Sequence, residues 1–197
     1  MEAITENIKS KGMIPSLWLA PFICQMESDI FENHTSWIAK DSNGNFLKAG
    51  YKSQWNGNFF VLDIYNEEVR AYLKKVFYTI IVEWGFEMVK LDYLYAITQI
   101  KRSDKSRGEI MCDGMAFLKE LVGDTLMSTS GVPLGSVFGK TNFCSISSKI
   151  SEKWETRLQR IINFRERNST LNAVNTNVSR RQLNGRAFIS DPDVFLL

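Results

Sequence analysis

The sequence predicts an α/β protein in which a parallel sheet is flanked by helices. Short apolar segments alternate with amphipathic helical segments over most of the chain, and no repeat or Gly-, Ser- or Pro-rich linker divides its 197 residues. Such alternation is typical of parallel βα units. We count about five strands, beginning near residues 16, 86, 125, 142 and 186, whereas a closed (β/α)8 barrel needs eight strands and typically about 250 residues. The chain is therefore either an open parallel sheet or an incomplete barrel, and its ends favour the barrel because it starts inside a helix and stops at Phe195 without a cap or tail.

The first elements follow from short local patterns. Residues 4–10 have the spacing of a helix end, and Gly12 follows it as a helix terminator. The apolar run Ser16-Leu-Trp-Leu-Ala has the length of a strand. Residues 27–58 are polar and punctuated by glycines, so we expect a long loop or an excursion from the main fold there, and long loops in compact domains are usually functional.

The longest helix is predicted over residues 67–84. Asn66 is a good N-cap, two glutamates occupy the first turn, and Gly85 ends the segment. Its apolar residues fall at helical spacing: Val69, Leu73, Val76, Phe77, Ile80, Ile81 and Trp84.

The remaining elements continue the alternation to the end of the chain. Strands are predicted over residues 86–92, 125–130, 142–146 and 186–190. Helices are predicted over residues 109–122, where Gly123 ends the segment, and over residues 154–165 and 171–181.

Composition excludes several classes of protein. With 24 Lys+Arg against 22 Asp+Glu the formal charge is +2, and 44% of the residues are hydrophobic, so we expect a globular protein that binds no nucleic acid. The apolar stretch 14–24 is broken by Pro15 and Pro21 and is far shorter than the roughly 20 residues of a spanning helix. The N-terminus is acidic where a secretory signal would be basic, so we expect a cytoplasmic protein that is not bound to membranes. Three scattered cysteines and one histidine, His34, predict no metal site, and we expect no cofactor.

Asp92 is the best candidate for a reactive group. In parallel α/β folds such groups lie just past the carboxyl ends of strands. Lys90 and Asp92 project to the same side of their strand, and a cation beside a carboxylate keeps it ionised. An ionised, oriented carboxylate suits a glycosidase nucleophile or a metal ligand. The alternative from pattern alone is that Asp92 caps the next helix.

Other candidate residues follow neighbouring strands. Ser190-Asp-Pro-Asp193 places two carboxylates after the last strand, where each is either a cap or a ligand. Three tryptophans, Trp18, Trp37 and Trp55, could stack on a sugar ring or lie in the core. Nucleotide binding is the weaker hypothesis because Gly131-Val-Pro-Leu-Gly135 has neither spacing of the phosphate-binding glycine motifs.

Several segments together resemble one family. They are Leu17-Trp-Leu-Ala-Pro-Phe-Ile-Cys24, Glu83-Trp-Gly-Phe86, Met88-Val-Lys-Leu-Asp-Tyr-Leu-Tyr95, Arg107-Gly-Glu-Ile-Met111, Gly131-Val-Pro-Leu-Gly135, and Leu183-Asn-Gly-Arg-Ala-Phe-Ile-Ser-Asp-Pro-Asp-Val-Phe-Leu-Leu197. The chain resembles the catalytic barrel of the microbial α-galactosidases (melibiases), glycoside hydrolase family 36. The resemblance implies that residues 1–197 form a single incomplete barrel domain with about the third to the seventh strand. The family's N-terminal β-domain, first barrel strands and C-terminal β-domain would be absent.

The resemblance also implies roles for particular residues. The family is retaining, so one carboxylate attacks the sugar carbon and a second protonates the leaving oxygen and later activates water. The nucleophile corresponds to Asp92, Lys90 would hold sugar hydroxyls, and Trp18 would form an aromatic wall. The implied ligand is an α-galactoside or a related oligosaccharide.

The second carboxylate is where the sequence departs from the family. The family pattern Asp-Tyr-Cys-Arg-Ile-Gly-Pro-Asp aligns with Asn142-Phe-Cys-Ser-Ile-Ser-Ser-Lys149, and Lys153-Trp-Glu155 follows in both. Ser145 therefore replaces an arginine and Lys149 replaces the acid/base aspartate, while Ser130 replaces a cysteine. A lysine has an unperturbed pKa of about 10.4, far above that of a useful general acid. We expect that the chain descends from an α-galactosidase and is itself inactive. The alternative is a silent truncated remnant or a weak sugar-binding fragment.

An incomplete barrel has one further consequence. Strands at both ends of its sheet lack partners, which favours self-association through the open edges.

Overall fold

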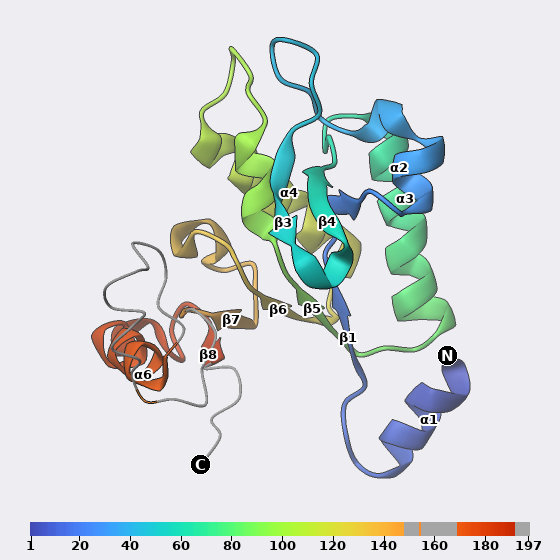
Figure 1. Cartoon of the computed structure of the whole chain (residues 1–197). Coiled ribbons are helices and arrows are strands. Elements are labelled where there is room, and N and C mark those ends of the chain that lie inside the picture. The colour runs from blue at the N-terminus through green and yellow to red at the C-terminus, as the bar shows by residue number, and fades with distance from the viewer. Residues whose placement is uncertain (148–153, 155–168, 192–197) are drawn as a thin grey trace.

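The computed structural model of the chain describes residues 1–147, 154 and 169–191 (Figure 1). Its centre is a five-stranded parallel sheet in the order β1-β5-β6-β7-β8. The strands are β1 (Ser16–Leu19), β5 (Met88–Leu91), β6 (Leu126–Thr129), β7 (Phe143–Ser145) and β8 (Ile189–Asp191). The predicted α/β class and the five parallel strands are confirmed, although β8 begins three residues later than expected because the amides of Arg186 and Ala187 donate to the Leu183 carbonyl in a turn.

The two faces of the parallel sheet differ in burial. One face packs on the core, with Val89, Leu91, Met127 and Cys144 all at 0% exposure. The other face carries Trp18, Lys90 and the buried Ser128 in one register row across β1, β5 and β6. Ile189, on the same face of β8, is 51% exposed. The face with Lys90 is the one that is open to a ligand.

A second, antiparallel sheet occupies the segment that the sequence predicted as a long loop. It has the order β2-β4-β3, with β2 (Ile23–Gln25), β3 (Lys48–Lys52) and β4 (Gly57–Val61). The loop prediction for residues 27–58 was wrong because β3, Lys-Ala-Gly-Tyr-Lys, has no apolar pattern of its own. Its partner β4 supplies the buried side chains Phe59, Phe60 and Val61. Gly50 allows this packing, since a Cβ there would lie 2.5 Å from the Phe59 ring.

The helices confirm the periodicity of the sequence with small shifts. They are α1 (Glu2–Ser10), α2 (Asp29–Asn33), α3 (Glu67–Tyr78), α4 (Arg107–Val122) and α6 (Thr170–Ser179). Asn66 caps α3 as expected, accepting a hydrogen bond from the Glu68 amide at 2.8 Å, and a π-helical turn, Thr79–Glu83, continues it. The start of α4 is earlier than predicted because Ser106 and Glu109 form a capping box.

Short 3-10 helices connect these elements. They are η1 (Thr35–Trp37), η2 (Ser53–Trp55), η4 (Leu94–Gln99), η5 (Leu134–Val137) and η6 (Arg181–Leu183). The helix predicted over residues 154–165 lies, beyond Trp154, outside the described residues. Within the described ranges, every helix is too short or too polar to cross a bilayer.

Candidate functional site

A cleft of about 950 Å³ opens at the carboxyl end of the parallel sheet. It is lined from the strand ends and from α6 by Trp18, Lys90, Asp92, Ser130, Ser145 and Arg180, among other residues. The five site residues that the sequence predicted within the described ranges therefore meet in one place. Lys149, the sixth, lies outside the described residues.

The Asp92 carboxylate is fixed by the turn that follows β5. Its backbone amide donates to the Leu19 carbonyl at 2.9 Å, and its Oδ1 accepts from the Tyr93 amide at 2.7 Å. Tyr93 has a φ of 55°, a left-handed conformation that non-glycine residues adopt only with support from their surroundings. The cap of α4 is Ser106, so Asp92 does not cap the next α-helix.

Gly131 forms the floor beside this carboxylate. It has a φ of 60°, and a Cβ there would lie 3.5 Å from Asp92 Oδ1 and 3.4 Å from the Tyr93 nitrogen. Its carbonyl accepts from the Tyr95 amide at 2.7 Å, which joins the turns after β5 and β6. A glycine is required here by the left-handed backbone more than by the space.

Lys90 makes an ion pair across the sheet. Its Nζ lies 2.9 Å from Oδ2 of Asp191 on β8, and the same oxygen accepts a hydrogen bond from Ser145 Oγ at 3.2 Å. The sequence predicts that Asp191 is either a cap or a ligand. The structure makes it the partner of Lys90, a role that the alternation within Ser190-Asp-Pro-Asp could not reveal because it depends on a contact between distant strands.

Aromatic rings form one wall of the cleft. Trp18 is 46% exposed and lies edge-on to Tyr93, with ring centroids 6.4 Å apart, and 6.3 Å from Trp55. Lys52 Nζ lies 4.3 Å from the Trp55 ring centre and donates to the Tyr93 hydroxyl at 3.3 Å, which ties this wall to β3. Trp37 lies elsewhere, buried in a separate apolar cluster with its indole NH donating to Glu68.

The contribution of α6 to the cleft was not predicted from the sequence. Asn172 and Thr176 line the cleft from one side of α6, and Arg180, which caps the C-terminal end of this helix, lines the cleft beside them. Arg180 Nη1 donates to the Ile146 carbonyl, just after β7, at 2.7 Å. The four-residue spacing of polar side chains was the available signal, but a polar stripe ordinarily indicates a solvated face.

Buried groups behind the sheet are not reactive. Burial raises the pKa of the Cys144 thiol, and burial likewise raises the pKa of Cys24 to about 11, so both are neutral thiols at pH 7. In the described part of the chain, no three His, Cys, Asp or Glu side chains gather in a way that could hold a metal ion.

Comparisons with known proteins identify a matching family model and solved structures with a similar fold. The family model described as Melibiase matches residues 1–122. The structure of TtGalA, an alpha-galactosidase from Thermus thermophilus, in complex with stachyose has a TM-score of 0.85 and 23% identity, covering 99% of this chain and 42% of that one. The same enzyme in complex with p-nitrophenyl alpha-D-galactopyranoside has a TM-score of 0.85 and 24% identity, covering 100% of this chain and 40% of that one. At these identities the likeness shows a shared fold, and this chain spans about two fifths of the solved chains.

Proposed function

The chain belongs to the melibiase family, and from that premise we propose that its cleft is an α-galactoside site in which Asp92 is the nucleophile of a retaining glycoside hydrolase. The observation that carries the proposal is the position of Asp92. Its carboxylate lies at the end of a parallel strand in one cleft with an exposed tryptophan, a lysine and two serines. Aromatic faces and fixed hydroxyl or ammonium groups are what a sugar ring requires, the first for its C–H face and the others for its hydroxyls.

The first chemical step follows from this geometry. A carboxylate oxygen of Asp92 would form a bond to the anomeric carbon while the bond from that carbon to the leaving oxygen breaks, giving a glycosyl ester and the leaving group. The left-handed turn at Tyr93 and the backbone amide on Oδ1 hold the carboxylate in a fixed orientation before the substrate arrives. Lys90, Ser130 and Ser145 would hold the sugar hydroxyls, and Trp18 would stack on the ring.

The leaving oxygen of a natural disaccharide needs a proton, and that is where this chain is expected to fail. The family's acid/base position is Lys149, an ammonium that gives up its proton only near pH 10 when unperturbed. General acid–base assistance is typically worth about 10² to 10⁴ in rate. We therefore propose that the chain binds α-galactosides and does not turn over melibiose. The second candidate is a catalytically silent truncated remnant or a weak sugar-binding fragment, in which Asp92 forms no bond to the sugar, and the same lysine favours it.

A galactosyl fluoride with a slow second step tests the nucleophile, because fluoride leaves with little help from an acid. We expect trace labelling of the 197-residue chain, located at Asp92 by peptide mass spectrometry and absent from Asp92→Asn. Asp124→Asn, which alters an exposed carboxylate at the opposite end of β6, is the matched control and should label as the parent does.

Two results would contradict the proposal. A label on another residue would show that Asp92 is not the nucleophile. Melibiose hydrolysis by the unmodified chain, abolished by Asp92→Asn, would show that the inactive assignment is wrong.

A further inference from the structure

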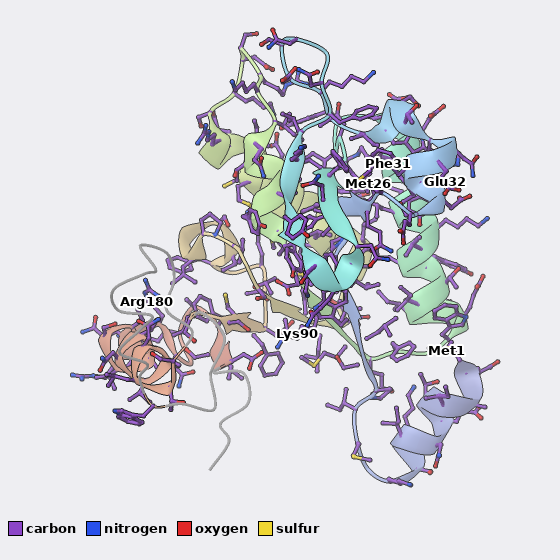
Figure 2. The ribbon with its side chains drawn as sticks, in the orientation of Figure 1. Met1, Met26, Phe31, Glu32, Lys90 and Arg180 are labelled. Atoms are coloured by element: carbon purple, nitrogen blue, oxygen red, sulfur yellow. The ribbon has the colours of Figure 1, made fainter. Side chains whose placement is uncertain are left out.

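The cleft has a second wall that the proposed chemistry does not use. It is formed by Asn172 and Thr176 of α6 and by Arg180, the residue at the C-terminal cap of this helix, and all three line the same cleft as Asp92. Figure 1 shows α6 beside β8, at the end of the sheet farthest from β1, and Figure 2 labels Arg180, which follows this helix directly. The Thr176 hydroxyl and the Arg180 guanidinium are groups that can donate hydrogen bonds to a ligand.

Arg180 is held in a defined orientation at the edge of this wall. Its Nη1 donates to the Ile146 carbonyl at 2.7 Å, and that carbonyl follows β7, whose Ser145 also lines the cleft. A guanidinium has five N–H donors in a planar fork, so one bond to a carbonyl leaves the rest of the fork for a ligand. Among the described residues, no carboxylate forms a salt bridge with Arg180.

The two ends of the cleft differ in charge. Near the strands, Lys90 is matched by Asp191 at 2.9 Å, and Asp92 adds a carboxylate. On the α6 side, the cation that the structure describes is Arg180. Among the described residues that line the cleft, a carboxylate of the ligand would find in Arg180 a cation that no described carboxylate already pairs in a salt bridge.

The volume of the cleft is also large enough for more than one sugar ring. About 950 Å³ is at the upper end of the range for sites that hold drug-sized ligands, and it leaves room beyond the ring that would contact Asp92. The additional room is bounded by α6.

We propose that the α6 wall binds the second unit of the ligand and that Arg180 selects an acidic one, so that the preferred ligand is an α-galactoside whose aglycone carries a carboxylate. This inference rests on the proposed function, because it takes the first unit to be a galactosyl ring at Asp92. A guanidinium suits a carboxylate through two parallel N–H···O bonds.

Melibionate and melibiitol form a matched pair of probes. Both are α-galactosides of an open-chain six-carbon aglycone, and they differ by a carboxylate against a hydroxymethyl group. We expect isothermal titration of the whole chain at low salt to show melibionate binding about fivefold more tightly, the upper range for an exposed charge pair. The preference should shrink as salt is raised because such pairs are screened.

Three variants distinguish the effect of the Arg180 charge from a structural effect of the substitution. Arg180→Gln should abolish the preference for melibionate, so that the two probes bind within about twofold of each other, an expectation for a rim charge. Arg180→Lys should keep part of it. Arg181→Gln removes the neighbouring arginine, which is exposed and outside the cleft lining, and should behave as the parent.

Failure of this inference is distinguishable from failure of the proposed function. Equal binding of the two probes by the parent chain, or a preference that is independent of salt and of Arg180→Gln, would overturn the inference and leave the galactoside site standing. Absence of binding by both probes and by methyl α-galactoside would overturn the site itself. If Arg180→Gln does not fold, the salt series on the parent chain decides the question.

Discussion

At the scale of single residues, the ion pair between Lys90 and Asp191 links the cleft to the far edge of the sheet. The two side chains are 30% and 24% exposed, so each charge is partly removed from water and depends on the other. Ser145 donates to the same oxygen, which completes a small network between β5, β7 and β8. Such networks orient a cation more firmly than a solvated lysine could be held.

Asp191→Asn should therefore affect both stability and the site. The substitution removes one carboxylate charge beside a partly buried ammonium, and we expect a loss of about 1–2 kcal/mol in the free energy of unfolding. Urea denaturation measures this. The matched control is Glu87→Gln, which breaks the 2.8 Å pair with Lys9, where the two side chains are 39% and 53% exposed, and it should cost less than about 0.5 kcal/mol. Equal effects of the two variants would show that the Lys90 pair is ordinary surface charge.

Site residues differ in how far the sequence could predict them. Trp18, Lys90 and Asp92 were found because they sit at strand ends, where local alternation fixes the side of the sheet. Asp191 was seen as a carboxylate, but its partner lies 101 residues away in the chain, and no local pattern carries that information.

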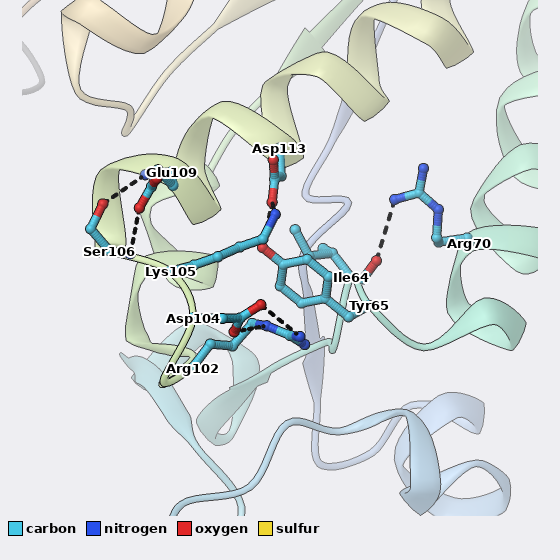
Figure 3. A network of polar contacts seen from close by, with 9 residues as sticks. All are labelled: Ile64, Tyr65, Arg70, Arg102, Asp104, Lys105, Ser106, Glu109 and Asp113. Carbon is cyan, nitrogen blue, oxygen red and sulfur yellow. Dashed lines mark hydrogen bonds and ion pairs between the residues drawn. The ribbon is translucent and has the colours of Figure 1, made fainter.

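At the scale of elements, a polar network anchors the segment between η4 and α4. Figure 3 shows the side chains of Tyr65 and Lys105 pointing toward Asp113. It also shows the Arg102 guanidinium, which donates two hydrogen bonds to the Asp104 carboxylate. The Tyr65 hydroxyl donates to Asp113 Oδ2 at 2.7 Å, and the Arg102 guanidinium lies 4.3 Å from the Tyr65 ring centre. This segment connects the Asp92 turn to α4, so its anchoring supports the turn indirectly.

The network predicts a pH dependence of stability. Hydrogen bonds from Lys105 and then Tyr65 lower the pKa of Asp113 below its ordinary value. A carboxyl whose folded pKa is depressed contributes stability above its unfolded pKa of about 3.9, and loses it as pH falls through the folded pKa. The difference in unfolding free energy between the parent and Asp113→Asn should therefore be full at pH 6 and shrink below about pH 4.

Urea titrations at a series of pH values check this expectation. Tyr65→Phe removes one of the two donors, so the parent and this variant should also converge in acid, with a smaller difference at pH 6. A difference between the parent and Asp113→Asn that stays constant from pH 6 down to pH 3 would contradict the assignment.

A helix or strand was predictable from the sequence where its own segment carries an apolar periodicity. The apolar spacing of α3 and α4 follows from their burial in the two apolar clusters of the described structure, and the periodicity located both helices. The hairpin of β3 and β4 was missed because Lys48–Lys52 gains its stability from the aromatic side chains of the partner strand. The position of α6 against the cleft was missed because helical periodicity specifies a face and not the surface that the face meets.

At the scale of the whole molecule, the Lys90–Asp191 contact shows that the parallel sheet is curved. β5 and β8 are separated by three strand spacings, roughly 14 Å across a flat sheet. A lysine and an aspartate standing upright on such a sheet could not close that gap to 2.9 Å. The face with Lys90 must therefore be concave, as the inner face of a barrel wall is. This agrees with the fold shared with the alpha-galactosidase structures.

This concave face and the two edges of the sheet predict how the isolated chain behaves. β1 and β8 are the end strands of the described sheet, each hydrogen-bonded to one neighbour. Unpaired strand edges beside an exposed apolar surface, which includes Trp18 and Ile189, are a known cause of association. We expect sedimentation velocity of the purified 197-residue chain to show dimers or larger species that grow with concentration.

A charge introduced on the edge strand distinguishes association through the unpaired strand edge from nonspecific association. Ile189→Lys puts an ammonium on β8 at a position that is 51% exposed, and inward charges on edge strands oppose pairing, so the distribution should move toward monomer. Val178→Lys adds the same charge on α6, where Val178 is 54% exposed, and should leave association unchanged if the sheet edge is the interface. If both variants shift the distribution toward monomer equally, the added net charge is the cause of the shift. Pairing of the sheet edge would then not be the cause of association. A monodisperse parent monomer with one cooperative melt would instead mean that the curved sheet is stable as an open α/β fold, with its concave face directly accessible to a sugar.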